Sequence, residues 1–420
     1  MTTSPTAPTP YIRRMLYVGG FDFPTTQARG IQSLHTAHAL ARVGIEVRLL
    51  VQRATGRRAP PADALTGYGL APHPRLTVVP LAVARADRIG WLEIHKRLAL
   101  TNWSYGAACL LDLIRTRTRP DVVFTRDPRL AWLFIRSWRV HRVPVVYEVH
   151  EIFSTRPRDN TSLAPGEVQG VADRTRALER AVFAEADFLF PLTTACADLL
   201  HHEFGVSRGR MAVLPDGTTA PTGPLPPRDP KARTVVYAGQ LYPWKGVDVL
   251  LRALALLPDA TLTVIGGRGA ADDADPDLAR CRALAAELGI ASRVTFTGFV
   301  PHAEVRGRLA GAGVAVAPLP DRLMSRYFTS PLKVFDYMAA GVPIVASDLP
   351  ALHDVLQDGD NALLVPPDDP AALATAIRRL LVNPGLADRL RRTAFAGTGA
   401  FTWDARAARI IESLRPPASG

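Results

Sequence analysis

The segment 327–347, which reads YFTSPLKVFDYMAAGVPIVAS, combines a helix start with a carboxylate and a following strand. Residues from Leu332 to Ala340 favour a helix of about nine positions, which Gly341 ends. The helix is preceded by three residues that favour a helix start: Thr329, Ser330 and Pro331. The pattern predicts a loop, a helix and a strand within an α/β sheet.

The start of this helix could bind an anion. Its first backbone N–H groups, from Ser330 to Leu332, lack partners within the helix, and the helix dipole adds positive potential there. Asp336 lies one turn further along the same face, where its carboxylate could accept hydrogen bonds from a ribose diol. A nucleoside diphosphate held at two points and an ordinary capped, half-buried helix both explain this spacing.

Positively charged groups gather near a second helix start. Only four of the 50 basic residues are lysine, and Lys245 directly precedes the predicted helix 247–257. Its ammonium and the helix dipole would face the same anion. Lys333 and the amide of Gln240 could add further donors. A solvated lysine at a helix start is the alternative for Lys245.

His150 and Glu151 follow the predicted strand PVVYEV at its carboxyl end. Open α/β sheets bind ligands at that end of their strands, so a His-Glu pair there is well placed for chemistry. A structural role is the alternative, because most single histidines are structural.

Glycine-rich turns follow other predicted strands. Gly19 and Gly20 close MLYVGG, and we expect them in a loop whose backbone could approach a ligand closely. Turns in the second half of the chain would lie beside the nucleotide. They contain Gly267, Gly298, Phe299 and Val300.

Composition excludes several classes of protein. The chain has 420 residues, 47% of them hydrophobic and 21% charged, as in globular proteins. No apolar run could span a membrane and no signal peptide is evident, so a cytoplasmic protein with at most peripheral membrane contact is expected. The charge of +11 comes from scattered arginines without interleaved aromatics, which disfavours nucleic-acid binding. Three distant cysteines indicate no disulfide framework and no metal site.

Length and pattern predict two α/β domains, each a Rossmann-like parallel sheet. The first spans residues 11–217 and ends in a strand at 211–217. A proline-rich linker, 218–232, leads to the second domain, 233–400. Residues 401–420 form a last helix and a tail.

The residues SPLKVFDYMAAG resemble the nucleotide-sugar signature of the retaining glycosyltransferases of family 4, which have the GT-B fold. Most members carry two glutamates separated by seven residues. Here Asp336 stands at the second position, which holds the ribose in the family, and Phe328 stands at the first, which usually contacts the donor sugar. The resemblance covers about residues 15–414 and implies that the last helix crosses back to the first domain.

The same resemblance implies further roles. Lys245 matches the second member of a basic pair that binds the donor diphosphate, and Gln240 replaces the usual Arg. His150 matches a histidine beside the donor sugar, and the turn at Gly298 matches one whose backbone contacts the base.

The expected function is therefore transfer of a sugar, with retention and without a metal or other cofactor, from a nucleoside diphosphate donor, with UDP or GDP as the expected base. The acceptor could be a small molecule, a glycan or a lipid-linked sugar. A nucleotide-sugar 2-epimerase and an inactive nucleotide-sugar-binding protein remain alternatives, the second because Phe328 and Gln240 depart from the family pattern.

Overall fold

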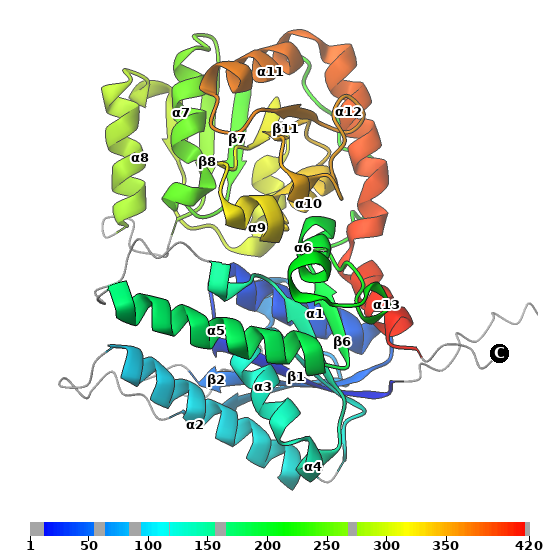
Figure 1. Ribbon diagram of the computed structural model, residues 1–420. Helices are drawn as coiled ribbons and strands as arrows, with labels where there is room; N and C mark the ends of the chain where they lie inside the picture. Colours follow the sequence, from blue (N-terminus) through cyan, green and yellow to red (C-terminus); the bar gives the residue numbers. More distant parts are fainter. Residues whose placement is uncertain are drawn as a thin grey trace, which may run out of the picture.

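The computed structural model describes residues 12–53, 64–83, 94–116, 118–155, 165–267 and 275–415. These residues form two parallel α/β domains that face each other, as the sequence predicts (Figure 1). Residue 11 at the predicted domain start and 416–420 in the predicted tail lie outside the described residues.

The first sheet has the strand order β3-β2-β1-β4-β5-β6, with every pair parallel. Its strands are β1 (Arg14–Phe23), β2 (Glu46–Arg53), β3 (Leu76–Leu81), β4 (Val122–Thr125), β5 (Val145–Val149) and β6 (Phe188–Pro191). Helices cover both faces, so the strands are continuous apolar runs rather than alternating ones. These helices are α1 (Ala28–Arg42), α2 (Ile94–Arg115), α3 (Pro128–Arg136), α4 (Trp138–His141), α5 (Pro165–Glu185) and α6 (Thr194–Phe204).

The second sheet repeats this topology as β12-β11-β10-β7-β8-β9. Its strands are β7 (Thr234–Ala238), β8 (Thr261–Ile265), β9 (Val294–Phe296), β10 (Val314–Ala317), β11 (Ile344–Ser347) and β12 (Leu363–Val365). Its helices are α7 (Val247–Ala255), α8 (Pro276–Glu287), α9 (His302–Leu309), α10 (Leu332–Ala340), α11 (Pro370–Val382) and α12 (Pro384–Gly397). In each sheet the strand order reverses direction beside the first strand, which is where such folds bind ligands.

Local sequence explains several helix starts. Three helices, α3, α8 and α11, begin with an Asp-Pro pair. In each, the Asp carboxylate accepts two backbone hydrogen bonds, and Pro takes the first helical position, where its missing N–H costs nothing. The three pairs are Asp127-Pro128, Asp275-Pro276 and Asp369-Pro370.

The last helix, α13 (Trp403–Ser413), crosses back to the first domain and packs against α1 (Figure 1). Trp403 and Ile410 are buried in the same apolar cluster as residues of β1 and α1. The crossing predicted from the family resemblance is confirmed. Thr218 pairs with Thr402, so the two chain crossings between the domains lie side by side.

Two predictions about the first domain are wrong. β1 continues to Phe23, so Gly19 and Gly20 lie inside the strand rather than in a loop. Residues 211–217 do not form a last strand, because within them only Met211 forms a bridge, to Leu189.

Candidate active site

A cleft of about 870 Å³ lies between the carboxyl ends of the two sheets and is lined by both domains. This volume is typical of a site for a small organic ligand. Almost all predicted site residues line it: His150, Glu151, Gln240, Lys245, Gly267, Phe299, Val300, Thr329, Ser330, Pro331, Leu332, Lys333 and Asp336. Gly19 and Gly20 do not line the cleft, since they belong to β1.

The start of α10 faces the cleft. The helix has the predicted bounds and ends at Gly341, whose φ of 64° is left-handed. Its first turn receives no hydrogen bond from a capping side chain. Ser330 and Thr329 do not cap it: Ser330 Oγ accepts from the Asp216 N–H at 2.8 Å, and Thr329 Oγ1 donates to the Met324 carbonyl. The backbone donors of this turn therefore remain available to a ligand.

Two lysines flank this helix start. Lys333 Nζ is buried without a hydrogen-bond partner and lies 3.6 Å from the centroid of the Tyr237 ring. Burial lowers the pKa of Lys333 well below its usual value, and the nearby Lys245 lowers it further. Burial also lowers the pKa of Lys245. Two like charges thus share a desolvated wall, and a cation held in this way favours an anionic ligand.

Glycine backbone completes this wall. Gly266, at φ of 136°, has no room for a side chain, because an added Cβ would lie 2.1 Å from the carbonyl oxygen of Gly239. The Gly266 N–H donates to the Gly298 carbonyl at 3.0 Å, which joins the turns after β8 and β9. Gly298 itself does not line the cleft, but the next two residues, Phe299 and Val300, do.

Asp336 is 7% exposed and already has protein partners. Its Oδ1 accepts from Thr218 Oγ1 at 2.7 Å, and its Oδ2 lies 3.5 Å from His302 Nε2. Burial opposes protonation of His302, but the hydrogen bond and charge of Asp336 outweigh it and raise the pKa of His302. His302 also lines the cleft, and no motif in the sequence marks it as a site residue.

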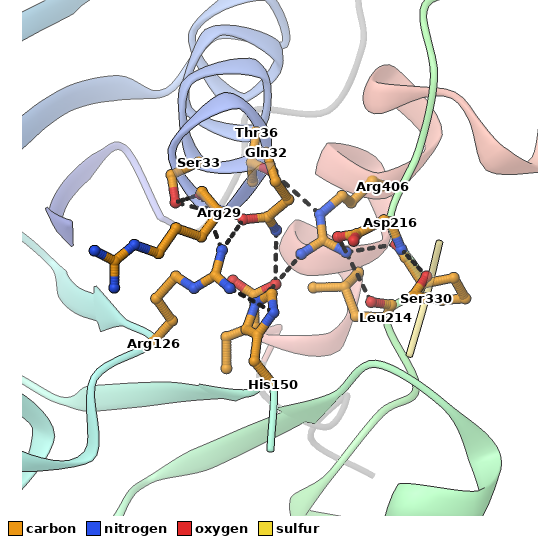
Figure 2. Close-up of polar contacts among 12 residues, drawn as sticks. Arg29, Gln32, Ser33, Thr36, Arg126, His150, Leu214, Asp216, Ser330 and Arg406 are labelled. Atoms are coloured by element: carbon orange, nitrogen blue, oxygen red, sulfur yellow. Dashed lines mark hydrogen bonds and ion pairs between the residues drawn. The ribbon is translucent and has the colours of Figure 1, made fainter. Parts of the chain in front are cut away.

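His150 is held on both sides of its ring. Arg126 donates from Nη2 to His150 Nδ1 at 2.7 Å, and His150 Nε2 lies 2.9 Å from Glu148 Oε1 (Figure 2). A guanidinium can only donate, so Nδ1 is the acceptor and the ring proton is on Nε2, facing the carboxylate. Burial and Arg126 lower the pKa of His150 to about 4, although Glu148 opposes this.

Glu148 connects His150 to the end of the chain. This carboxylate in β5 has no exposed surface, and its Oε1 accepts from Gln32 and from Arg406 of α13. Burial alone would raise the pKa of Glu148, but Arg406, His150 and Arg126 together hold it well below its usual range. Arg406 also donates to the carbonyls of two residues in the segment that leads to the linker, Leu214 and Pro215 (Figure 2).

Asp216 is a further cleft residue that sequence reasoning misses, because the pattern at 211–217 favours a strand. It is 7% exposed, and its Oδ1 has no hydrogen-bond partner. Its partner cation among the described residues is Arg406, whose Nη1 lies 4.0 Å from Oδ1. Glu151 and Phe328, 7% and 4% exposed, also line the cleft.

Comparison with known proteins identifies the family. The model of the glycosyl transferase 4-like domain matches residues 30–217, and that of glycosyl transferases group 1 matches residues 232–383. D-inositol 3-phosphate glycosyltransferase of Acidothermus cellulolyticus is 30% identical over 392 residues, with 88% of this chain and 81% of the relative covered. The chain belongs to the group 1 glycosyltransferases. The enzyme of the same name from Xylanimonas cellulosilytica is 28% identical, with 94% of each chain covered.

Solved structures place this glycosyltransferase in the GT-B fold. Sucrose-phosphate synthase of Thermosynechococcus elongatus has a TM-score of 0.73 and 19% identity, with 95% of this chain and 98% of that chain covered. HepE of Anabaena, solved in complex with UDP and glucose, has a TM-score of 0.67 and 17% identity, with 96% and 99% covered. At such identities the likeness shows the fold alone.

The described residues contain neither a candidate membrane span nor a candidate metal site. None of the helices among them is both long and apolar enough to cross a membrane. No group of three or more His, Cys, Asp or Glu side chains in the described part of the glycosyltransferase has the arrangement of a metal site.

Proposed function

We propose that this glycosyltransferase moves a sugar from a nucleoside diphosphate to a hydroxyl group of an acceptor, with retention of anomeric configuration and without a metal. The observation that carries the proposal is the pair of buried lysines, Lys245 and Lys333, beside the open start of α10. No carboxylate among the described residues pairs with either lysine.

A diphosphate satisfies this wall in three ways. It neutralises two ammonium groups that otherwise repel each other, and it gives Lys333 Nζ the partner that it lacks. It also accepts from the free N–H groups at the start of α10. When the glycosidic bond breaks, negative charge grows on the departing diphosphate, so the same donors stabilise the transition state more than the bound donor. Gln240, which also lines the cleft, adds amide N–H donors without adding a charge.

The rest of the donor lies along the second domain in this proposal. The base lies against the backbone of Gly267 and of the turn that Gly298, Phe299 and Val300 form. Asp336 accepts from the ribose with Oδ2, because Thr218 occupies Oδ1. HepE, which was solved with UDP and glucose in the same fold, supports a UDP sugar as the first donor to test.

The sugar and the acceptor lie toward the first domain. We assign contacts with them to His150 and Glu151, which follow β5 and line the cleft. Both ring nitrogens of His150 already face protein groups, so His150 orients its neighbours and the sugar rather than accepting a proton. The names of the relatives make D-inositol 3-phosphate the first acceptor to test.

Proton NMR of a reaction in EDTA tests this function. The protein is incubated with UDP-glucose and D-inositol 3-phosphate, then with GDP- and ADP-glucose and other polyols. We expect nucleoside diphosphate release and a new glycoside with the α configuration of the donor. A product of inverted configuration, a strict metal requirement, or an epimerised nucleotide sugar formed without an acceptor would contradict the proposal.

A further inference from the structure

Asp216 combines burial with an unused hydrogen-bond acceptor. It is 7% exposed, and Oδ1 has no hydrogen-bond donor although the side chain lines the cleft. A buried carboxylate oxygen without a donor costs stability. Such an atom persists where a ligand supplies the missing donor, and in this cleft that donor is a hydroxyl group.

The groups around Asp216 leave it only partly compensated. Arg406 on α13 is its partner cation, at 4.0 Å, but its guanidinium is shared with Glu148 and with two carbonyls. Glu148 on β5 repels the Asp216 charge, while Arg126 after β4 and the Gln32 amide on α1 favour it. Burial is the largest influence, and the pKa of Asp216 rises to about 6.

Asp216 also lies at the boundary between the two halves of the cleft. Its backbone N–H donates to Ser330 Oγ at 2.8 Å, so the residue is tied to the start of α10 (Figure 2). That helix start is the proposed diphosphate site. In a retaining transfer the acceptor attacks on the face that the diphosphate leaves, so a proton acceptor is needed next to the diphosphate. His150, with both ring nitrogens engaged, does not meet this need.

We infer that Asp216 is a catalytic residue that binds the acceptor hydroxyl and takes its proton, an inference that rests on the proposed function. The acceptor O–H bond breaks, and its proton goes to the Asp216 carboxylate. The acceptor oxygen forms a bond to the anomeric carbon. The bond from that carbon to the diphosphate breaks, and its electron pair leaves with the diphosphate.

The decisive variant is Asp216→Asn, which keeps the shape of the side chain and removes its basicity. Hydrolysis of UDP-glucose is the assay, because water then serves as the hydroxyl acceptor. We expect the rate to fall by at least about 100-fold, the usual effect of a general base. The affinity for UDP, measured by calorimetry, should stay within about twofold of the wild type, since the proposed UDP contacts lie on the second domain.

The pH profile separates a chemical role from a structural one. In the wild type, kcat/KM should rise with pH across about 6 as Asp216 loses its proton, and Asp216→Asn should lack this rise. The raised pKa means that the ionised group destabilises the fold above that pH. The Tm of Asp216→Asn at pH 7.5 should therefore equal or exceed that of the wild type.

Asp404→Asn is the matched control, because Asp404 is a half-exposed carboxylate on α13 outside the cleft, and its rate and pH profile should not change. Near-wild-type hydrolysis by Asp216→Asn, or a rise near pH 6 that persists in it, would overturn the inference and leave the departing phosphate as the proton acceptor. If UDP does not bind the wild type, the donor site itself is wrong, and the inference falls with it.

Discussion

The two walls of the cleft treat positive charge in opposite ways. On the first-domain wall, Arg126 and Arg406 are engaged by His150, Glu148 and backbone carbonyls. On the second-domain wall, Lys333 lacks any hydrogen-bond partner. Paired cations hold a wall in one geometry, whereas unpaired buried cations store an electrostatic cost that only an anion relieves. The first wall is therefore built for orientation and the second for an anionic ligand.

Breaking the paired wall should have the largest effect on stability. Arg406→Met leaves the fully buried Glu148 without its main counter-charge, so we expect a loss of about 3–5 kcal/mol in the free energy of unfolding. Urea denaturation measures it. Adding Glu148→Gln to this variant should restore most of the loss, because the uncompensated charge is then gone. A single variant as stable as the wild type would show that the pair is not needed.

The same ion pair has a defined pH dependence. The folded pKa of Glu148 lies below its usual value of 4.5, so its contribution to stability is complete above that pH and is lost as the pH falls below it. Wild type and the double variant should thus differ in stability more at pH 7 than at pH 3. Urea denaturation at the two pH values measures this, and a difference that does not change with pH would contradict it.

Removing one unpaired cation should act on catalysis instead. Lys245→Ala should lower kcat/KM at least about 100-fold, or about 2.7 kcal/mol, with little change in Tm. Lys231→Ala removes an exposed lysine that precedes β7 and serves as the control. Steady-state kinetics with UDP-glucose decide the matter, and near-wild-type activity would remove Lys245 from the site.

A smaller effect is expected at the ribose position. Asp336→Ala removes one charged acceptor, which corresponds to about 10-fold weaker nucleotide binding, or roughly 1.4 kcal/mol. Calorimetry with UDP measures this. Because Asp336 also accepts from Thr218, Thr218→Val shows what the loss of that contact alone does. Unchanged affinity for UDP in Asp336→Ala would exclude the ribose contact.

The smallest effect should come from an exposed ion pair on the same helix as Arg406. Arg42 of α1 lies 3.2 Å from Asp404 of α13, with side chains 56% and 42% exposed. Arg42→Gln should cost less than about 1 kcal/mol in urea denaturation, since water screens such pairs. A cost similar to that of Arg406→Met would mean that any contact between α1 and α13 matters equally.

The sequence predicts the second-domain wall better than the first. The donor wall is built from short segments, so the local pattern gives α10 with its observed bounds, and the rare lysines stand out. The paired wall depends on contacts across 258 positions, as between Arg406 and Glu148, which no local pattern contains. One local signal does exist: a glutamate inside an apolar parallel strand is buried and therefore needs a partner.

Glycine is the least reliable guide to the site. Gly19 and Gly20 resemble a ligand-binding turn in sequence, yet both continue β1. Gly19 is needed for packing, because a Cβ there would lie 2.5 Å from the Phe21 ring. Asp216, in contrast, lies in a segment whose sequence favours a strand, and only its burial and its missing donor distinguish it.

Calorimetric titration of UDP in EDTA into the wild type and into a Lys245→Met, Lys333→Met double variant tests the central claim most directly. We predict that the wild type binds UDP without added metal and that the double variant, with its fold intact by circular dichroism, does not bind it. Equal affinity in both proteins, or no binding by the wild type, would contradict the assignment of the unpaired wall as the diphosphate site.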